Sequence, residues 1–71
     1  MDYREIIEYL GYAAGHELQV RITTQDGTTV VGIPSSVDAH LTANEVYVRP
    51  LGLDDTEIGL SLSAVTAVEL L

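Results

Sequence analysis

Apolar residues recur along the chain at two different spacings, and the spacing near the N-terminus is that of a helix. Asp2 and Glu5 stand in the pattern of a capping box, in which each side chain binds a backbone N–H group of the first helical turn. The apolar stripe behind them extends over about three turns. It consists of Tyr3, Ile6, Ile7 and Leu10. Because Gly11 and Gly15 are typical stop signals, we predict an amphipathic helix over residues 2–13.

From residue 17 the apolar residues alternate with polar ones, which is the period of a half-buried strand. Asp26 and Gly27 interrupt this alternation, and both residue types tolerate the positive φ of a tight hairpin turn. Gly32 predicts a bend or bulge in the next strand, and Pro34 predicts the end of its ladder or a position on a sheet edge. The predicted strands cover residues 17–25, 28–37, 44–49, 57–62 and 65–70.

Short strands separated by frequent turns predict a small closed barrel, because closure removes the exposed edges of so small a sheet. The expected fold class is therefore mainly β. It consists of the N-terminal helix followed by a five-stranded, strongly bent antiparallel barrel. We expect residues 1–71 to form a single domain.

The length of the chain and its lack of cysteine favour self-association. A chain of 71 residues has a thin core, and the absence of cysteine excludes disulfides and thiolate metal sites. Binding to further copies is the remaining common source of stability. The lack of cysteine also favours a cytoplasmic location. We further expect no membrane segment and no signal peptide, because no apolar run has the required length.

The charge is strongly negative. Eleven Asp and Glu residues stand against three Arg and no Lys, which gives a formal net charge of −8. Phosphate groups are bound by cationic side chains, so this balance opposes non-specific binding to nucleic acid or to an anionic membrane.

Several residues around the first predicted hairpin stand at a particular spacing. An apolar-x-apolar strand that ends at Ile22 is followed by Gly27, by Gly32 five residues later and by Asp38 a further six residues on, and Leu41 lies three residues beyond Asp38. This spacing resembles the first motif of the Sm family, which has an apolar residue at the position of Leu41. The preceding helix and the short turn before the last strand are also similar to Sm-like architecture. The resemblance implies an Sm-like, SH3-like barrel.

In Sm-like rings the fourth strand of one subunit pairs with the fifth strand of the next. The resemblance therefore implies a homo-oligomeric ring, and the apolar residues of these two strands are interface candidates. They are Ile58, Leu60, Leu62, Val65, Val68 and Leu70. The alternative is that these side chains only fill the thin core.

The usual RNA-binding residues of the family are replaced in this chain. Thr42 occupies the position of a common Asn, the nearest Asn is Asn44, and Ser61-Leu62 stands where an Arg-Gly pair is usual. The remaining candidates for binding RNA or another ligand lie after the second predicted strand and within the third. They are Asp38, His40, Thr42, Asn44, Tyr47 and Arg49. RNA binding is thus disfavoured and kept as the alternative function.

Other chemistry has weaker support. Asp38 and His40 resemble two ligands of a metal site. Zinc sites need three or four ligands, however, and His16 is the only other imidazole in the chain. The simpler interpretation is that the Asp38 carboxylate binds backbone N–H groups of its own loop. The acidic stretch at residues 54–57 reads as a solvated turn. Partial burial explains the helical tyrosines, which leaves Tyr47 as the aromatic residue most suited to an interface.

No nucleophile motif or phosphate-binding loop is present, so we expect no enzyme, no cofactor and no metal. The predicted function is a non-enzymatic, self-associating Sm-like module that contacts a protein partner. The acidic balance, the hairpin and the length are also similar to the Rho-binding antitermination factor, an acidic Sm-like protein that works by binding a protein.

Overall fold

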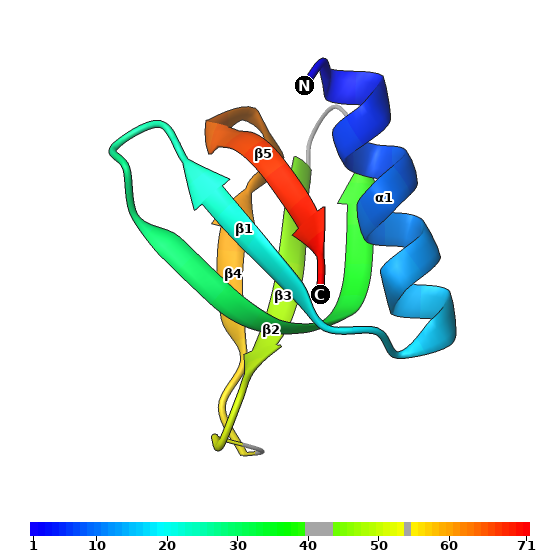
Figure 1. Ribbon diagram of the computed structural model, residues 1–71, viewed down its shortest axis with the longest axis vertical. Helices are drawn as coiled ribbons and strands as arrows, with labels where there is room; N and C mark the ends of the chain where they lie inside the picture. Colours follow the sequence, from blue (N-terminus) through cyan, green and yellow to red (C-terminus); the bar gives the residue numbers. More distant parts are fainter. Residues whose placement is uncertain (40–43, 54) are drawn as a thin grey trace.

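A helix packs against a strongly curved antiparallel sheet in the computed structural model, which describes residues 1–39, 44–53 and 55–71 (Figure 1). Within these ranges the helix α1 spans Tyr3–His16. The strands are β1 (Val20–Thr24), β2 (Thr29–Ala39), β3 (Asn44–Pro50), β4 (Ile58–Ser61) and β5 (Val65–Leu70). A single 3-10 turn, η1 (Leu62–Ala64), joins β4 to β5. The expected class, a helix followed by a five-stranded antiparallel sheet, is confirmed.

The helix begins as predicted and ends later. Asp2 is the N-cap and forms the full capping box with Glu5. The predicted end at residue 13 is wrong, because α1 continues through both glycines to His16. The helix ends at Glu17, which adopts a left-handed conformation with φ 53°. Leu18 packs against the core and its N–H group donates to the Ala13 carbonyl at 2.9 Å, which fixes the end there.

The first hairpin turns where the sequence predicts it. Gly27 has φ 84°, and its N–H group donates to the Thr24 carbonyl at 3.0 Å. The Asp26 carboxylate accepts the Thr24 hydroxyl at 2.6 Å and the Thr28 N–H group at 3.0 Å. These bonds close the turn from both sides, so the hairpin is determined by local chemistry.

The long strand β2 serves two neighbours, and Gly32 lies where it passes from one to the other. β2 pairs with β1 as far as Gly32 opposite Val20, and with β3 from Gly32 opposite Pro50 onward. A Cβ atom at residue 32 would stand 2.2 Å from the Arg49 carbonyl oxygen, so the close approach requires glycine. The ladder with β1 ends before Pro34, as predicted, whereas the ladder with β3 continues past Pro34 through a register shift.

The strands are joined in the order β4-β3-β2-β1-β5, which leaves β4 and β5 at the two edges. The expectation of a closed barrel is corrected on this point, because no ladder joins β4 to β5 among the described residues. Each of these strands has its partner on one side alone, β3 for β4 and β1 for β5. The sheet is therefore curved but open.

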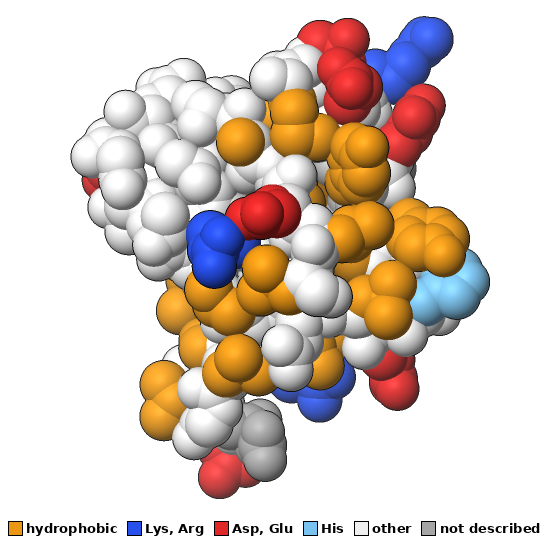
Figure 2. All heavy atoms as spheres, viewed as in Figure 1, with side chains coloured by type: hydrophobic (Ala, Val, Ile, Leu, Met, Phe, Trp, Pro, Cys, Tyr) orange, Lys and Arg blue, Asp and Glu red, His pale blue; other side chains and the backbone are white. Residues whose placement is uncertain are grey.

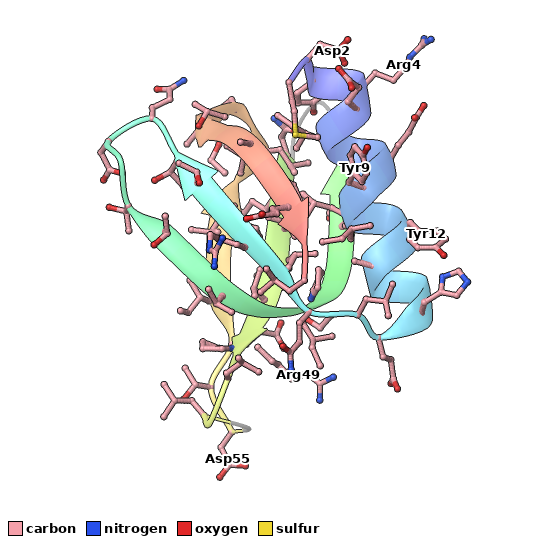
Figure 3. All side chains as sticks on the ribbon, in the orientation of Figure 1. Asp2, Arg4, Tyr9, Tyr12, Arg49 and Asp55 are labelled. Carbon is pink, nitrogen blue, oxygen red and sulfur yellow. The ribbon has the colours of Figure 1, made fainter. Side chains whose placement is uncertain are left out.

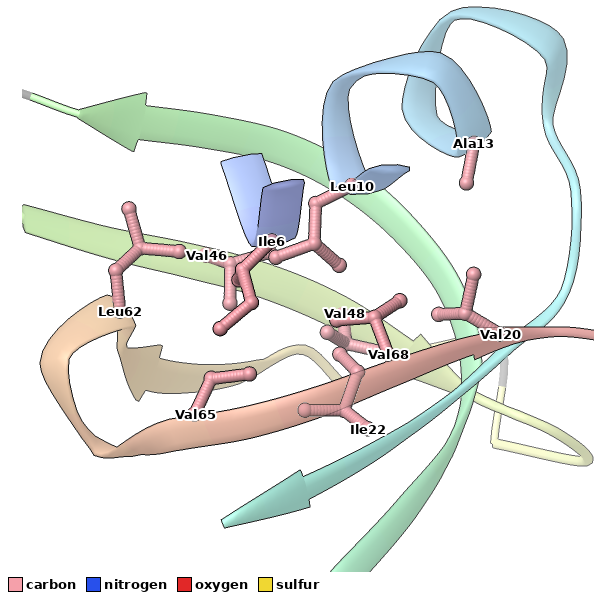
Figure 4. Packing of buried hydrophobic residues seen from close by; sticks show 10 residues of the cluster. All are labelled: Ile6, Leu10, Ala13, Val20, Ile22, Val46, Val48, Leu62, Val65 and Val68. Carbon is pink, nitrogen blue, oxygen red and sulfur yellow. The ribbon is translucent and has the colours of Figure 1, made fainter. Parts of the chain in front are cut away.

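The core lies between α1 and the inner face of the curved sheet, and Figure 4 shows its side chains converging from both. The helix contributes residues at the spacing of its inner face, and β1 and β3 contribute alternate residues. The core consists of Ile6, Leu10, Ala13, Val20, Ile22, Val46, Val48, Leu62, Val65 and Val68. In the part of the chain that is described, no helix combines the length and the apolar character that crossing a bilayer requires.

Candidate functional site

The candidate ligand-binding residues that the structure describes lie on β2 and β3, and they do not form one cluster. His40, Thr42 and the motif residue Leu41 lie outside the described residues. Asp38 is half-buried near the end of β2, opposite Glu45 on β3. Asn44 begins β3, and its side-chain oxygen accepts a hydrogen bond from the Tyr3 hydroxyl of α1. Asn44 is therefore already engaged by the helix.

Tyr47 lies on β3 within an acidic neighbourhood. Its ring stands over Gly59 of β4, since a Cβ atom there would meet the ring at 3.2 Å. A hydrogen bond to the Glu45 carboxylate raises the pKa of the Tyr47 hydroxyl, and the negative charges of Asp38 and Glu57 raise this pKa further. The surroundings of Tyr47 therefore repel an anionic ligand.

Arg49 shares the outward face of β3 with Tyr47, because alternate residues of a strand point to the same side. It is exposed, and the structure gives it no ion pair within the described ranges. Figure 3 places Arg49 at the base of the sheet, well away from Tyr9 and Tyr12 on α1. A single arginine on the same face as the acidic surroundings of Tyr47 makes a weak site for phosphate.

The two free sheet edges are the other candidate surface. Directly after β5, the Leu71 N–H group donates to the carbonyl of Gln19, the residue before β1, at 3.0 Å, so the N–H groups of Leu70 and of alternate residues before it point outward. The N–H group of Val68 confirms this direction, since it donates to the Met1 sulfur at 3.2 Å. A thioether is a weak acceptor, and a strand carbonyl would replace it readily.

The predicted interface residues divide into two groups by burial. Leu62, Val65 and Val68 belong to the core of a single copy, with at most 7% of their surface exposed. Ile58 and Leu60 are half-buried on β4, and Leu70 is exposed at the end of β5. The structure thus leaves a smaller accessible set than the sequence suggested, because the core of so short a chain recruits the rest.

A shallow hollow of about 370 Å³ lies beside β4, between that strand and the first hairpin. Leu60, Val30 and Ala64 supply its apolar lining, and the turn residues near Asp26 supply its polar rim. Apolar surface is therefore accessible next to the edge strand, as an interface requires.

Sequence reasoning missed a second surface, on the outside of α1. Tyr9 and Tyr12 are partly buried beside the apolar stripe, as expected, but 41% and 53% of their surfaces stay exposed, and no interface role was considered for them. Together with Glu5 and Glu8 they stand at positions i, i+3, i+4 and i+7, which share one face of a helix, and this spacing could have pointed to the surface.

Neither a protein-family model nor a curated protein matches this chain. Within the described residues, no group of three or more His, Asp or Glu side chains is placed to hold a metal ion.

Proposed function

We propose that the chain is a non-enzymatic Sm-like module that assembles with further copies of itself and contacts a protein partner. The observation that carries this proposal is the position of β4 and β5 at opposite edges of one sheet. Each edge has a row of backbone groups that an antiparallel strand can bind. Since the two edges differ, pairing β4 of one copy with β5 of the next is a head-to-tail contact, which closes into a ring when the rotation allows it.

Three further features support assembly. Ile58 and Leu60 on β4 and Leu70 on β5 are accessible apolar side chains along these edges. The chain is small and has no cysteine, so burying its edges is an efficient way to gain stability. The spacing of Gly27, Gly32 and Asp38 supports the Sm-like interpretation, in which the same two strands pair between subunits.

Mixed single-cysteine chains test the pairing directly, because the natural chain has no cysteine of its own. Aligning the two strands at their centres in antiparallel orientation places exposed Ser61 of β4 opposite exposed Thr66 of β5. We expect Ser61→Cys chains mixed with Thr66→Cys chains to form an intermolecular disulfide under mild oxidation, detected on a non-reducing gel. Ser61→Cys mixed with Thr29→Cys, an exposed residue of the inner strand β2, should not.

Light scattering at physiological salt gives the independent readout. We expect a mass several times that of the 7.7 kDa chain, and a smaller mass for Ile58→Lys, because a lysine on an edge strand opposes pairing. Leu53→Lys, on the exposed turn before β4, serves as the matched control and should assemble normally. A monomeric wild-type protein would contradict the assembly proposal.

RNA binding is the alternative function that the Sm resemblance implies, and the carboxylates near Tyr47 and the net charge of −8 argue against it. The cytoplasm stays our proposed location, on the cysteine-free composition alone.

A further inference from the structure

A groove of about 490 Å³ separates the outer side of α1 from the end of β5. Four of its residues come from α1 at positions i, i+3, i+4 and i+7, and therefore share one helical face. The lining consists of Glu5, Glu8, Tyr9, Tyr12 and Leu70. We name it the α1–β5 groove. Figure 2 shows hydrophobic side chains gathered over this side of the molecule, along the helix and β5.

The groove offers exposed apolar surface that the fold itself does not use. Tyr9 and Tyr12 are exposed, and 39% of the Leu70 surface is exposed beside them. The Tyr12 ring stacks on His16 with the ring centres 4.3 Å apart, which limits the freedom of that tyrosine. Contiguous exposed apolar surface of this kind is typical of a docking site, and aromatic rings held in place lose little entropy on binding.

The charge of the groove identifies its occupant. Glu5 and Glu8 border the tyrosines, and among the described residues neither carboxylate is in an ion pair. Glu5 is engaged at the N-terminus of α1, where its carboxylate accepts a hydrogen bond from the Asp2 backbone, so the charge argument depends mainly on Glu8. The chain has three arginines for eleven acidic residues, and Arg21 is paired with Glu69. A complementary ligand is therefore cationic, which excludes an anionic membrane or a nucleic acid.

We propose that the α1–β5 groove binds a protein segment in which arginine or lysine residues alternate with apolar ones. A guanidinium group stacks on the faces of Tyr9 and Tyr12 while it pairs with Glu8, and the apolar residues of the segment cover Leu70. This inference rests on the proposed contact with a protein partner. The groove shares Leu70 with the proposed β4–β5 contact, and its other four lining residues belong to α1.

Fluorescence anisotropy with a short labelled peptide of alternating arginine and leucine tests the proposal at physiological salt. We expect Glu8→Lys to weaken binding at least about tenfold and Tyr9→Ser to weaken it similarly. Asp55→Lys is the matched control, since it makes the same charge change on the exposed turn before β4, far from the groove (Figure 3). The affinity of Asp55→Lys for the peptide should stay within about twofold of wild type, because salt screens most of the attraction between the peptide and a distant charge.

Three results would overturn the inference. The first is no binding of the arginine–leucine peptide. The second is an equal loss of affinity in Glu8→Lys and Asp55→Lys, which would indicate attraction to the net charge alone. The third is a smaller assembly mass for Glu8→Lys or Tyr9→Ser, which would make the groove a contact between copies. If the peptide fails to bind while the Ser61–Thr66 disulfide still forms, self-assembly stands and the groove proposal fails.

Discussion

Asp26 shows at the scale of one residue how a local hydrogen-bond pattern produces both a turn and an unusual pKa. The hydroxyl of Thr24 and the N–H group of Thr28 donate to its carboxylate, and both donors favour the charged form. They lower the pKa of Asp26 from 3.8 to about 2, with the Thr24 hydroxyl as the largest cause. The charged carboxylate thus takes part in closing the hairpin.

This pKa gives a prediction with a definite sign. Because the folded pKa is lower than the unfolded one, the unfolded chain binds more protons between about pH 4 and pH 2. The stabilisation by Asp26 is present above this window and is lost as the pH falls through 2. We expect Thr24→Val to raise the Asp26 pKa, measured by NMR titration of the side-chain carboxyl carbon. An unchanged Asp26 pKa in this variant would contradict the assignment; Thr66→Val is the isosteric control.

At the scale of the element, β2 and α1 use glycine in opposite ways. Gly32 is required, since its backbone approaches the carbonyl of Arg49 too closely for a side chain. Gly11 of α1 has no atom within 4 Å of a Cβ built on it, so no contact requires glycine there. It lowers helix stability through its backbone entropy alone.

The two glycines therefore predict substitutions of opposite sign. We expect Gly32→Ala to lower the free energy of unfolding by about 1–3 kcal/mol or more, because a backbone clash cannot be relieved by a change of rotamer. Gly11→Ala should raise it by about 0.5–1 kcal/mol. Urea unfolding followed by circular dichroism measures both values. A Gly32→Ala protein as stable as wild type would mean that β2 and β3 do not cross as closely as described.

At the scale of the whole molecule, two surface features decide which partners suit the described structure: the excess of negative charge and the edges at β4 and β5. The charge is spread over α1, the turns and the outward face of β3, where Tyr47 lies among carboxylates. Such a surface keeps nucleic acid away and attracts cationic partners. Pairing at a strand edge, by contrast, joins backbone to backbone and depends little on charge.

This contrast predicts that the protein does not bind RNA. We expect no change in the anisotropy of labelled oligo-U up to high micromolar protein at physiological salt, since phosphates meet repulsion near Tyr47. An RNA-binding Sm protein serves as the positive control. Micromolar or tighter binding that weakens as salt is added would favour the RNA alternative instead. The ratio of absorbance at 260 and 280 nm of the purified protein gives a further check.

Much of the fold could be predicted from local signals. Asp2 with Glu5 marked the start of α1, Asp26-Gly27 marked the hairpin, and the last strand was predicted over the residues it occupies. The end of α1 could not be predicted in this way, because the packing of Leu18 on the core competes with the weak stop signals of Gly11 and Gly15. The same competition decides which apolar residues remain accessible.

The candidate sites were predicted less well, because they depend on contacts between distant segments. Asn44 was proposed to bind a ligand, but the hydroxyl of Tyr3, 41 residues earlier in the chain, donates a hydrogen bond to its side-chain oxygen. Partial burial of Tyr9 and Tyr12 was expected, but the groove that they form with Leu70 was not, since nothing in the sequence places Leu70 beside them.

The sequence by itself determined the class of fold, the order of its elements, the first hairpin and the sign of the net charge. These follow from residue types and spacings that act within a few positions or over the whole composition. The tertiary structure alone decided that β4 and β5 remain open edges, that Leu62, Val65 and Val68 enter the core, and that a groove forms beside α1. Strand register and side-chain burial depend on partners far away in sequence, and no local pattern contains that information.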